Sequence, residues 1–177
     1  MKPAVLAIVG HSGCGKTTLI EKLLPVLNKA GLRVATIKHT HHHVALDSSE
    51  KDSWRHKQAG ATASMLLTTS GMQLVTDVIE YSQLEQLAQR YFFDMDMVLA
   101  EGFSQTACAK IEVLRAACST IARCTAEDGL IAMVTDVEDC HMQLPHFVPD
   151  DISSIAQFVV NWQQQQGVLI MDKGTAP

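Results

Sequence analysis

Apolar positions in the first forty residues switch between unbroken runs and helical spacing. Residues 4–9 (AVLAIV) form a continuous apolar run, typical of a strand buried on both faces of a parallel sheet. Residues 16–30 place leucine and isoleucine at helical spacing and end at Gly31, a common helix stop. Pro25 lies inside that run, which predicts a kink or a break in the helix. A second strand is predicted over 33–38, so this region is typical of a βαβ unit.

The remaining pattern predicts further strands, a hairpin and a closing helix. A polar loop over 39–51 precedes a short helix over 52–59, and Ser70-Gly71 separates two strand-like runs, so part of the sheet is expected to be antiparallel. Ser82 and Glu85 form a capping-box pattern ahead of another helix. The other predicted elements are strands over 64–68, 72–76, 97–100, 111–114 and 130–134 and a helix over 151–165. We expect one domain over 1–166 and a tail over 167–177.

Composition narrows the class of protein. The chain has 177 residues, the size of one domain, and its 47% apolar content excludes a disordered chain. The net charge of −5 argues against a nucleic-acid partner, which would need a basic footprint. The first apolar run is too short for a signal peptide or a membrane span. Five cysteines without a C-x-x-C pair indicate reduced thiols, so a cytoplasmic protein is expected.

The strongest motif lies between the first strand and the first helix. Residues 10–17 (GHSGCGKT) fit G-x-x-x-x-G-K-[ST], the phosphate-binding P-loop. Its glycines let backbone amides approach phosphate oxygens, and the helix N-terminus adds positive potential there. Lys16 is predicted to reach the β- and γ-phosphates, and Thr17 to ligate Mg²⁺. The predicted fold is therefore an α/β P-loop NTPase three-layer sandwich, with a mostly parallel sheet and an antiparallel hairpin addition.

Three acidic residues compete to be the carboxylate partner of the P-loop. Asp94 and Asp96 precede the strand predicted over 97–100, whereas Glu101 follows it. Ligands of parallel sheets bind at the carboxyl ends of strands, and such a strand spans roughly 15 Å. Glu101 is therefore predicted to position metal or water, the alternative being that it only ends a strand near the site.

A histidine-rich loop follows the second strand at the same sheet edge. Lys38 and His39 begin the run K-H-T-H-H-H, for which a phosphate or ligand loop, a metal site and no specific role all stay open. Downstream, Asp52 or Ser53 is expected to cap the helix over 52–59.

Selection of a nucleotide base has no clear motif. The only Asn-Lys pair, Asn28-Lys29, lacks the rest of the guanine-reading N-K-x-D pattern. Asp136 follows the strand over 130–134 at the P-loop edge and could accept hydrogen bonds from guanine, or be an ordinary strand-end residue.

Taken together, the P-loop and four later motifs resemble the MobB family, adapter proteins of molybdopterin-guanine dinucleotide biosynthesis. These motifs are K-H-T-H-H-H, K-D-S, A-G-A and A-E-G-F, and the resemblance spans about residues 4–162. It implies a homodimer that binds GTP with Mg²⁺, hydrolyses it slowly at most, and assists the guanylyltransferase that joins GMP to molybdopterin. GTP, that guanylyltransferase and molybdopterin are thus the implied partners.

The resemblance also implies roles for particular residues. Mg²⁺ is expected near Thr17 and Glu101, and a ligand or partner is expected at the loop 38–52, which includes Lys38, His39 and Asp52. The implied phosphate-binding residues are Ser12, Gly13, Cys14, Gly15, Lys16, Thr17 and Thr18. Two positions depart from related patterns: Glu50 stands where the family often has glycine, and His11 where related dimeric ATPases have a signature lysine.

Two alternative functions stay open. A small-molecule kinase would close an arginine-rich lid over the phosphates, yet Arg90, Arg115 and Arg123 are scattered along the chain. A nickel-insertion GTPase would use the cluster His39–His43.

Overall fold

The computed structural model describes residues 2–40, 42, 44–77, 84–138 and 143–172. These form two compact units: the P-loop unit, Met1–His39 with Leu84–Pro177, and the hairpin unit, Thr40–Gln83. Residues 1–166 were expected from the sequence to form a single domain, and that expectation stays a prediction.

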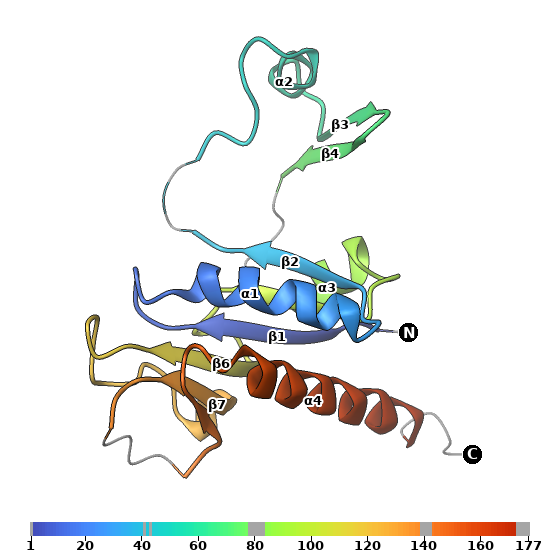
Figure 1. Ribbon diagram of the computed structural model, residues 1–177. Helices are drawn as coiled ribbons and strands as arrows, with labels where there is room; N and C mark the ends of the chain where they lie inside the picture. Colours follow the sequence, from blue (N-terminus) through green and yellow to red (C-terminus); the bar gives the residue numbers. More distant parts are fainter. Residues whose placement is uncertain (1, 41, 43, 78–83, 139–142, 173–177) are drawn as a thin grey trace. The chain divides into compact units, whose positions relative to one another are not determined.

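A six-stranded sheet forms the centre of the P-loop unit (Figure 1). Its order is β2-β5-β1-β6-β7-β8, and every neighbouring pair is parallel. The strands are β1 Ala4–Val9, β2 Val34–Lys38, β5 Met97–Glu101, β6 Ala109–Leu114, β7 Leu130–Thr135 and β8 His146–Phe147. The predicted strands are confirmed apart from small shifts at their ends, and the two-residue β8 is additional. Because β5 lies between β2 and β1, the carboxyl ends of these three strands meet at one edge.

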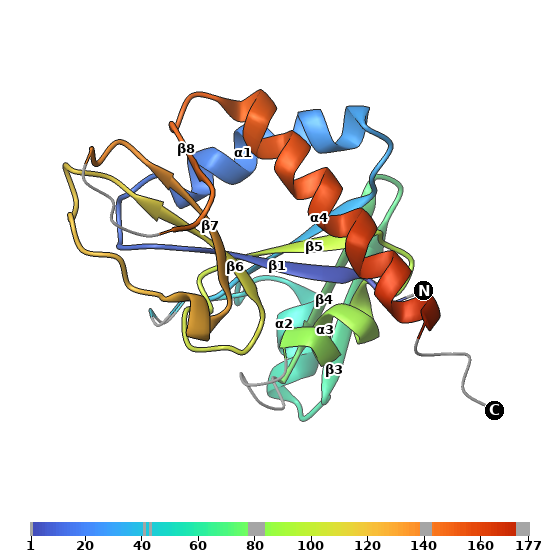
Figure 2. The same ribbon diagram turned by 90° about the horizontal axis from the view of Figure 1, so that it is seen from below.

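Helices and loops cover both faces of this sheet, which confirms the three-layer architecture. Helices α1 (Lys16–Lys29) and α4 (Ile152–Asp172) pack on one face (Figure 2). Helix α3 (Leu84–Tyr91) packs on the other, together with loops that follow β5 and β6. The apolar core on the first face includes Leu6, Ile8, Leu23, Leu27, Leu99, Ile111, Ile155 and Val159. A 3₁₀ turn, η1 (Ala126–Asp128), precedes β7. Among the described helices, none combines the length and apolarity needed to cross a bilayer.

Helix α1 continues through Pro25, so a break there was wrong. Leu23 and Leu27 flank the proline and are both 0% exposed. Burying each leucine contributes about 2 kcal/mol, which together offsets a cost of about 3 kcal/mol for proline inside a helix.

Helix α4 also differs from the prediction, because it extends to Asp172 where a tail or strand was expected from Gly167. A glycine inside a helix costs only about 1 kcal/mol, and the residues after it include good helix formers. The predicted cap of α3, Ser82, lies outside the described residues.

The hairpin unit contains α2 (Asp52–Gln58) and the antiparallel pair β3 (Ala63–Thr68) and β4 (Gly71–Thr76). The predicted hairpin is confirmed, but it forms its own two-stranded sheet, so the main sheet has no antiparallel member within the described chain. Cross-strand pairs Met65↔Leu74 and Leu67↔Met72 share one face of the hairpin, which we call the hairpin face. These four side chains are exposed to 55%, 36%, 75% and 68% respectively.

Candidate nucleotide-binding site

Two glycines determine the path of the P-loop between β1 and α1. Gly10 has φ 137°, and a Cβ atom there would lie 2.3 Å from the carbonyl oxygen of Val113 in β6. Gly15 is the N-cap of α1 with φ 92°, a left-handed conformation that side chains disfavour. The loop therefore lies against the carboxyl end of β6 and is followed directly by the first turn of α1.

Lys16 folds back over this loop. Its Nζ donates hydrogen bonds to the carbonyl oxygens of Gly10 at 3.2 Å and His11 at 2.8 Å. Ser12, Gly13, Thr17 and Thr18 are exposed around it, whereas Cys14 is buried. The ammonium and the N-terminus of α1 thus place positive potential on one exposed loop, which suits an anion.

Glu101 lies beside Thr17, at the carboxyl end of β5. The Thr17 hydroxyl donates to Glu101 Oε2 at 2.9 Å, and Lys38 Nζ lies 3.1 Å from Glu101 Oε1. The Glu101 side chain is 13% exposed and that of Lys38 is 61% exposed. A hydroxyl and a carboxylate are the hard oxygen donors that Mg²⁺ prefers, so the two residues fit that ion.

The competing aspartates lie away from the P-loop, as the strand direction predicted. Asp96 precedes β5, and its Oδ2 accepts a hydrogen bond of 2.7 Å from the backbone N–H of Arg33, just before β2. Asp94 also precedes β5, so both belong to the amino-end edge of the sheet.

His39 is held at the end of β2 by Glu101 and by Phe103, two residues further along. Its backbone N–H donates to the Glu101 carbonyl at 3.0 Å, and its ring lies 5.3 Å from the Phe103 ring. Phe103 has φ 62°, an unusual conformation for a bulky side chain. The A-E-G-F segment therefore positions both the Glu101 carboxylate and His39.

The rest of the histidine run and Asp52 belong to the hairpin unit. His41 and His43 lie outside the described residues, and the described part of the chain holds no group of three metal-ligating side chains. Asp52 is exposed and lies 3.4 Å from Arg55. The expected cap by Asp52 or Ser53 was wrong, since Lys51 is the N-cap of α2. The Ser53 hydroxyl instead donates to Asp47 at 2.6 Å, which is the main cause that lowers the pKa of Asp47.

Asp136 follows β7 and fixes the loop that follows β6. Its two carboxylate oxygens accept hydrogen bonds of 2.7 Å from the Ala116 backbone N–H and from Arg115 Nε. The Ala116 N–H, followed by Arg115, lowers the pKa of Asp136. This geometry favours the strand-end alternative, and a contact with guanine stays a prediction.

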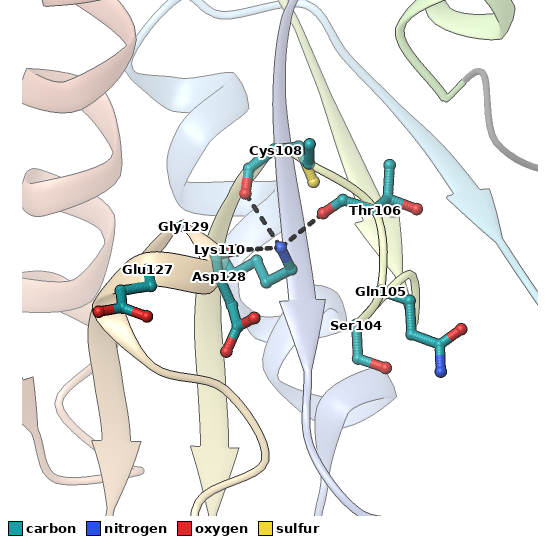
Figure 3. Close-up of a pocket in the computed structure, with 9 residues that line it drawn as sticks. Ser104, Gln105, Thr106, Cys108, Lys110, Glu127, Asp128 and Gly129 are labelled. Atoms are coloured by element: carbon teal, nitrogen blue, oxygen red, sulfur yellow. Dashed lines mark hydrogen bonds between the residues drawn. The ribbon is translucent and has the colours of Figure 1, made fainter.

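A pocket outside the predicted site surrounds Lys110 (Figure 3). Its volume is about 330 Å³, and residues of the β5–β6 loop and of η1 line it. Lys110 is 1% exposed, and its Nζ donates to the carbonyl oxygens of Thr106, Cys108 and Asp128. An ammonium has three N–H donors, so these bonds satisfy it and tie the segment after Glu101 to η1.

Glu112, two positions further along β6, has a similar structural role. It is fully buried, and its carboxylate accepts from the backbone N–H groups of Arg123 at 2.7 Å and Cys124 at 3.0 Å. We did not predict either role, although two charges within the apolar strand AKIEVL were a signal for buried, satisfied groups.

Comparisons with known proteins agree with the motif-based resemblance. Residues 5–136 match the family model for molybdopterin guanine dinucleotide synthesis protein B, MobB. The chain is 35% identical to a molybdopterin-guanine dinucleotide biosynthesis adapter protein of Haemophilus influenzae, over 89% of this chain and 88% of that protein. It is 34% identical to the Escherichia coli protein of the same name, over 92% and 94% of the two chains. A crystal structure of molybdopterin-guanine biosynthesis protein B superposes with a TM-score of 0.69 at 28% identity, covering 90% of this chain and 99% of that one.

Proposed function

The chain belongs to the MobB family, and on this premise we propose that it is a cytoplasmic GTP-binding adapter in the biosynthesis of molybdopterin guanine dinucleotide. The observation that carries the nucleotide part of this proposal is the hydrogen bond between Thr17 and Glu101 at the mouth of the P-loop. It brings a hydroxyl and a carboxylate together beside the lysine that would hold the phosphates.

The P-loop would bind the triphosphate through its backbone amides over residues 12–18. Lys16 uses two donors on loop carbonyls, and the third of its three N–H groups would serve a phosphate oxygen. Thr17 and Glu101 would hold Mg²⁺, which when bound neutralises charge on the β- and γ-oxygens. Lys38 adds a second cation on the far side of the Glu101 carboxylate.

Slow hydrolysis at most is proposed. The Glu101 carboxylate is engaged by Thr17 on one oxygen and by Lys38 on the other, so using it as a base would require breaking an ion pair. This suits a protein that holds GTP for a guanylyltransferase and molybdopterin rather than turning it over rapidly.

We also propose that the chain acts as a homodimer through the hairpin face. Met65, Leu67, Met72 and Leu74 form an exposed apolar surface with no charged member. Such a surface is self-complementary, because an uncharged apolar patch can meet its own copy across a two-fold axis.

A reconstituted guanylyl transfer tests the proposed function. Molybdopterin, Mg²⁺-GTP and a purified guanylyltransferase are combined, and dinucleotide formation is measured with and without this protein. The wild type should raise product formation, whereas Lys16→Ala should not. Lys22→Ala is the matched control: Lys22 also belongs to α1 but pairs with Asp150 at the surface, so this variant should behave as the wild type does. Rapid formation of a phosphorylated small molecule would instead favour the kinase alternative.

A further inference from the structure

Arg115, the first residue after β6, is held through both its backbone and its side chain. Its carbonyl oxygen accepts hydrogen bonds from the backbone N–H groups of Cys118 at 2.8 Å and Ser119 at 2.9 Å. Its Nε donates to Asp136 Oδ2 at 2.7 Å, while Oδ1 of that carboxylate accepts from the Ala116 N–H at 2.7 Å. The direction of the guanidinium group is thus determined by contacts within the P-loop unit.

The Asp136 contact leaves the two Nη groups of Arg115 available to a ligand. A guanidinium has five N–H donors, and the bond from Nε uses one of them. Within the described residues, neither Nη group has a hydrogen-bond partner. The side chain is 40% exposed, so a molecule from solvent can reach these donors. They form a planar fork that matches two neighbouring acceptors in one plane.

Arg115 belongs to the same sheet edge as the P-loop. Strand β6 is the parallel neighbour of β1, and the P-loop glycine Gly10 lies directly against the Val113 carbonyl, two residues before Arg115. Strand β7 is parallel to β6 and brings Asp136 to that edge as well. A ligand bound at the P-loop therefore has Arg115 and Asp136 on its β6 side.

The direction of a bound nucleotide follows from the proposed function, on which this inference rests. Thr17 and Glu101 would hold Mg²⁺ on the β- and γ-phosphates, and Glu101 ends β5, on one side of β1. The nucleoside is at the other end of the phosphate chain, and β6 and β7 lie on the other side of β1. The base is therefore directed over the ends of β6 and β7, where Arg115 and Asp136 lie.

We propose that Arg115 is a specificity-determining residue, whose two Nη groups donate to O6 and N7 of guanine. Guanine presents two acceptors along this edge, whereas adenine presents an amino donor beside N7. The same pair of donors therefore fits guanine and opposes adenine. Asp136 acts on the base through Arg115 and is a positioning residue, because its carboxylate orients the guanidinium.

A nucleotide analogue tests this contact in the unmodified protein. The full chain is titrated calorimetrically with GTP and with 7-deaza-GTP, both with Mg²⁺; the analogue has a C–H group in place of N7 and keeps the triphosphate. We expect 7-deaza-GTP to bind about tenfold more weakly, because a hydrogen bond from a charged donor is lost. Equal affinities for the two nucleotides overturn the proposal.

A pair of variants assigns the contact to Arg115. Arg115→Met removes all its donors, and Arg123→Met removes an exposed arginine of the same loop as the matched control. Arg115→Met should bind GTP about tenfold more weakly than the wild type and no better than 7-deaza-GTP, whereas Arg123→Met should match the wild type. A preference for GTP over 7-deaza-GTP that survives in Arg115→Met overturns the proposal.

The outcomes separate this inference from the proposed function. A wild type that binds GTP, with the same base preference in Arg115→Met, refutes the role of Arg115 alone. A wild type that binds no GTP refutes the proposed function and this inference with it. If Arg115→Met does not fold, the comparison of GTP with 7-deaza-GTP in the wild type decides.

Discussion

The Thr17 hydroxyl donates a hydrogen bond of 2.9 Å to Glu101 Oε2, across 84 positions of sequence. The parallel pairing of β1 with β5 creates this contact, because it brings the end of β5 level with the end of β1, where the P-loop begins. The register pairs Ile8 with Glu101 and, through β2, Lys38 with Glu101. The Glu101 carboxylate thereby lies between Thr17, in the first turn of α1, and Lys38, at the end of β2.

Replacing Glu101 with glutamine should remove most of the Mg²⁺ dependence of GTP binding, because a neutral amide is a much poorer ligand for a hard cation. The measurement is GTP affinity at a series of Mg²⁺ concentrations. Glu85→Gln removes a carboxylate that is 54% exposed beside Lys2 and serves as the matched control. Unchanged Mg²⁺ dependence in Glu101→Gln would remove Glu101 from the site.

Replacing Lys38 with methionine should lower the Mg²⁺ concentration needed for half-maximal GTP binding. The ammonium 3.1 Å from Glu101 competes with the metal for that carboxylate, and an ion pair of this exposure is worth up to about 1 kcal/mol, or about fivefold. The same Mg²⁺ series measures the effect, with Lys22→Met as the control. A higher Mg²⁺ requirement would show that Lys38 helps to assemble the site.

Replacing Asp136 with asparagine should destabilise the P-loop unit most at neutral pH. The Ala116 N–H and Arg115 hold the pKa of this carboxyl below its ordinary value of 3.8. Its contribution is therefore present above that value and is lost as the pH falls through the lower pKa of the folded state. Urea unfolding of both proteins from pH 7 down to pH 3 measures it.

The difference in unfolding free energy between wild type and Asp136→Asn should shrink toward the acid end of this series. Asp150→Asn removes a carboxylate that is 92% exposed and controls for the loss of a surface charge. A difference that is constant with pH would contradict the assigned role of the Asp136 carboxylate.

Replacing Leu67 with lysine should convert the proposed dimer to a monomer. Leu67 is 75% exposed on the hairpin face, and a charge at an apolar two-fold contact would face its own copy. Light scattering coupled to size-exclusion chromatography reports the mass. Ile121→Lys alters a side chain that is 76% exposed elsewhere and should leave the mass unchanged. A wild type that is already monomeric would refute the dimer.

The sequence was sufficient to choose Glu101 over its neighbours. Strand direction alone separates a residue that follows β5 from Asp94 and Asp96, which precede it. The ion pair between Lys38 and Glu101 could not be predicted in this way. It depends on β5 lying directly beside β2, and spacing along the chain contains no information on that strand order.

Long-range partners account for the other gaps. The Asp136 carboxylate is committed to the turn after β6, which its local sequence pattern does not indicate. Helix α4 extends beyond Gly167 because one glycine is too weak a stop signal. Local periodicity, by contrast, was enough for β1, α1 and the hairpin.

Isothermal titration of GTP, GDP and ATP with Mg²⁺ into the wild type and Lys16→Ala tests the central claim most directly. We expect the wild type to bind GTP more tightly than ATP, and Lys16→Ala to bind GTP at least about tenfold more weakly because a charged hydrogen bond to phosphate is lost. Lys22→Ala, on the same helix, should match the wild type. Absence of GTP binding by the wild type would contradict the account, and equal affinity for ATP and GTP would remove the claim of guanine selection.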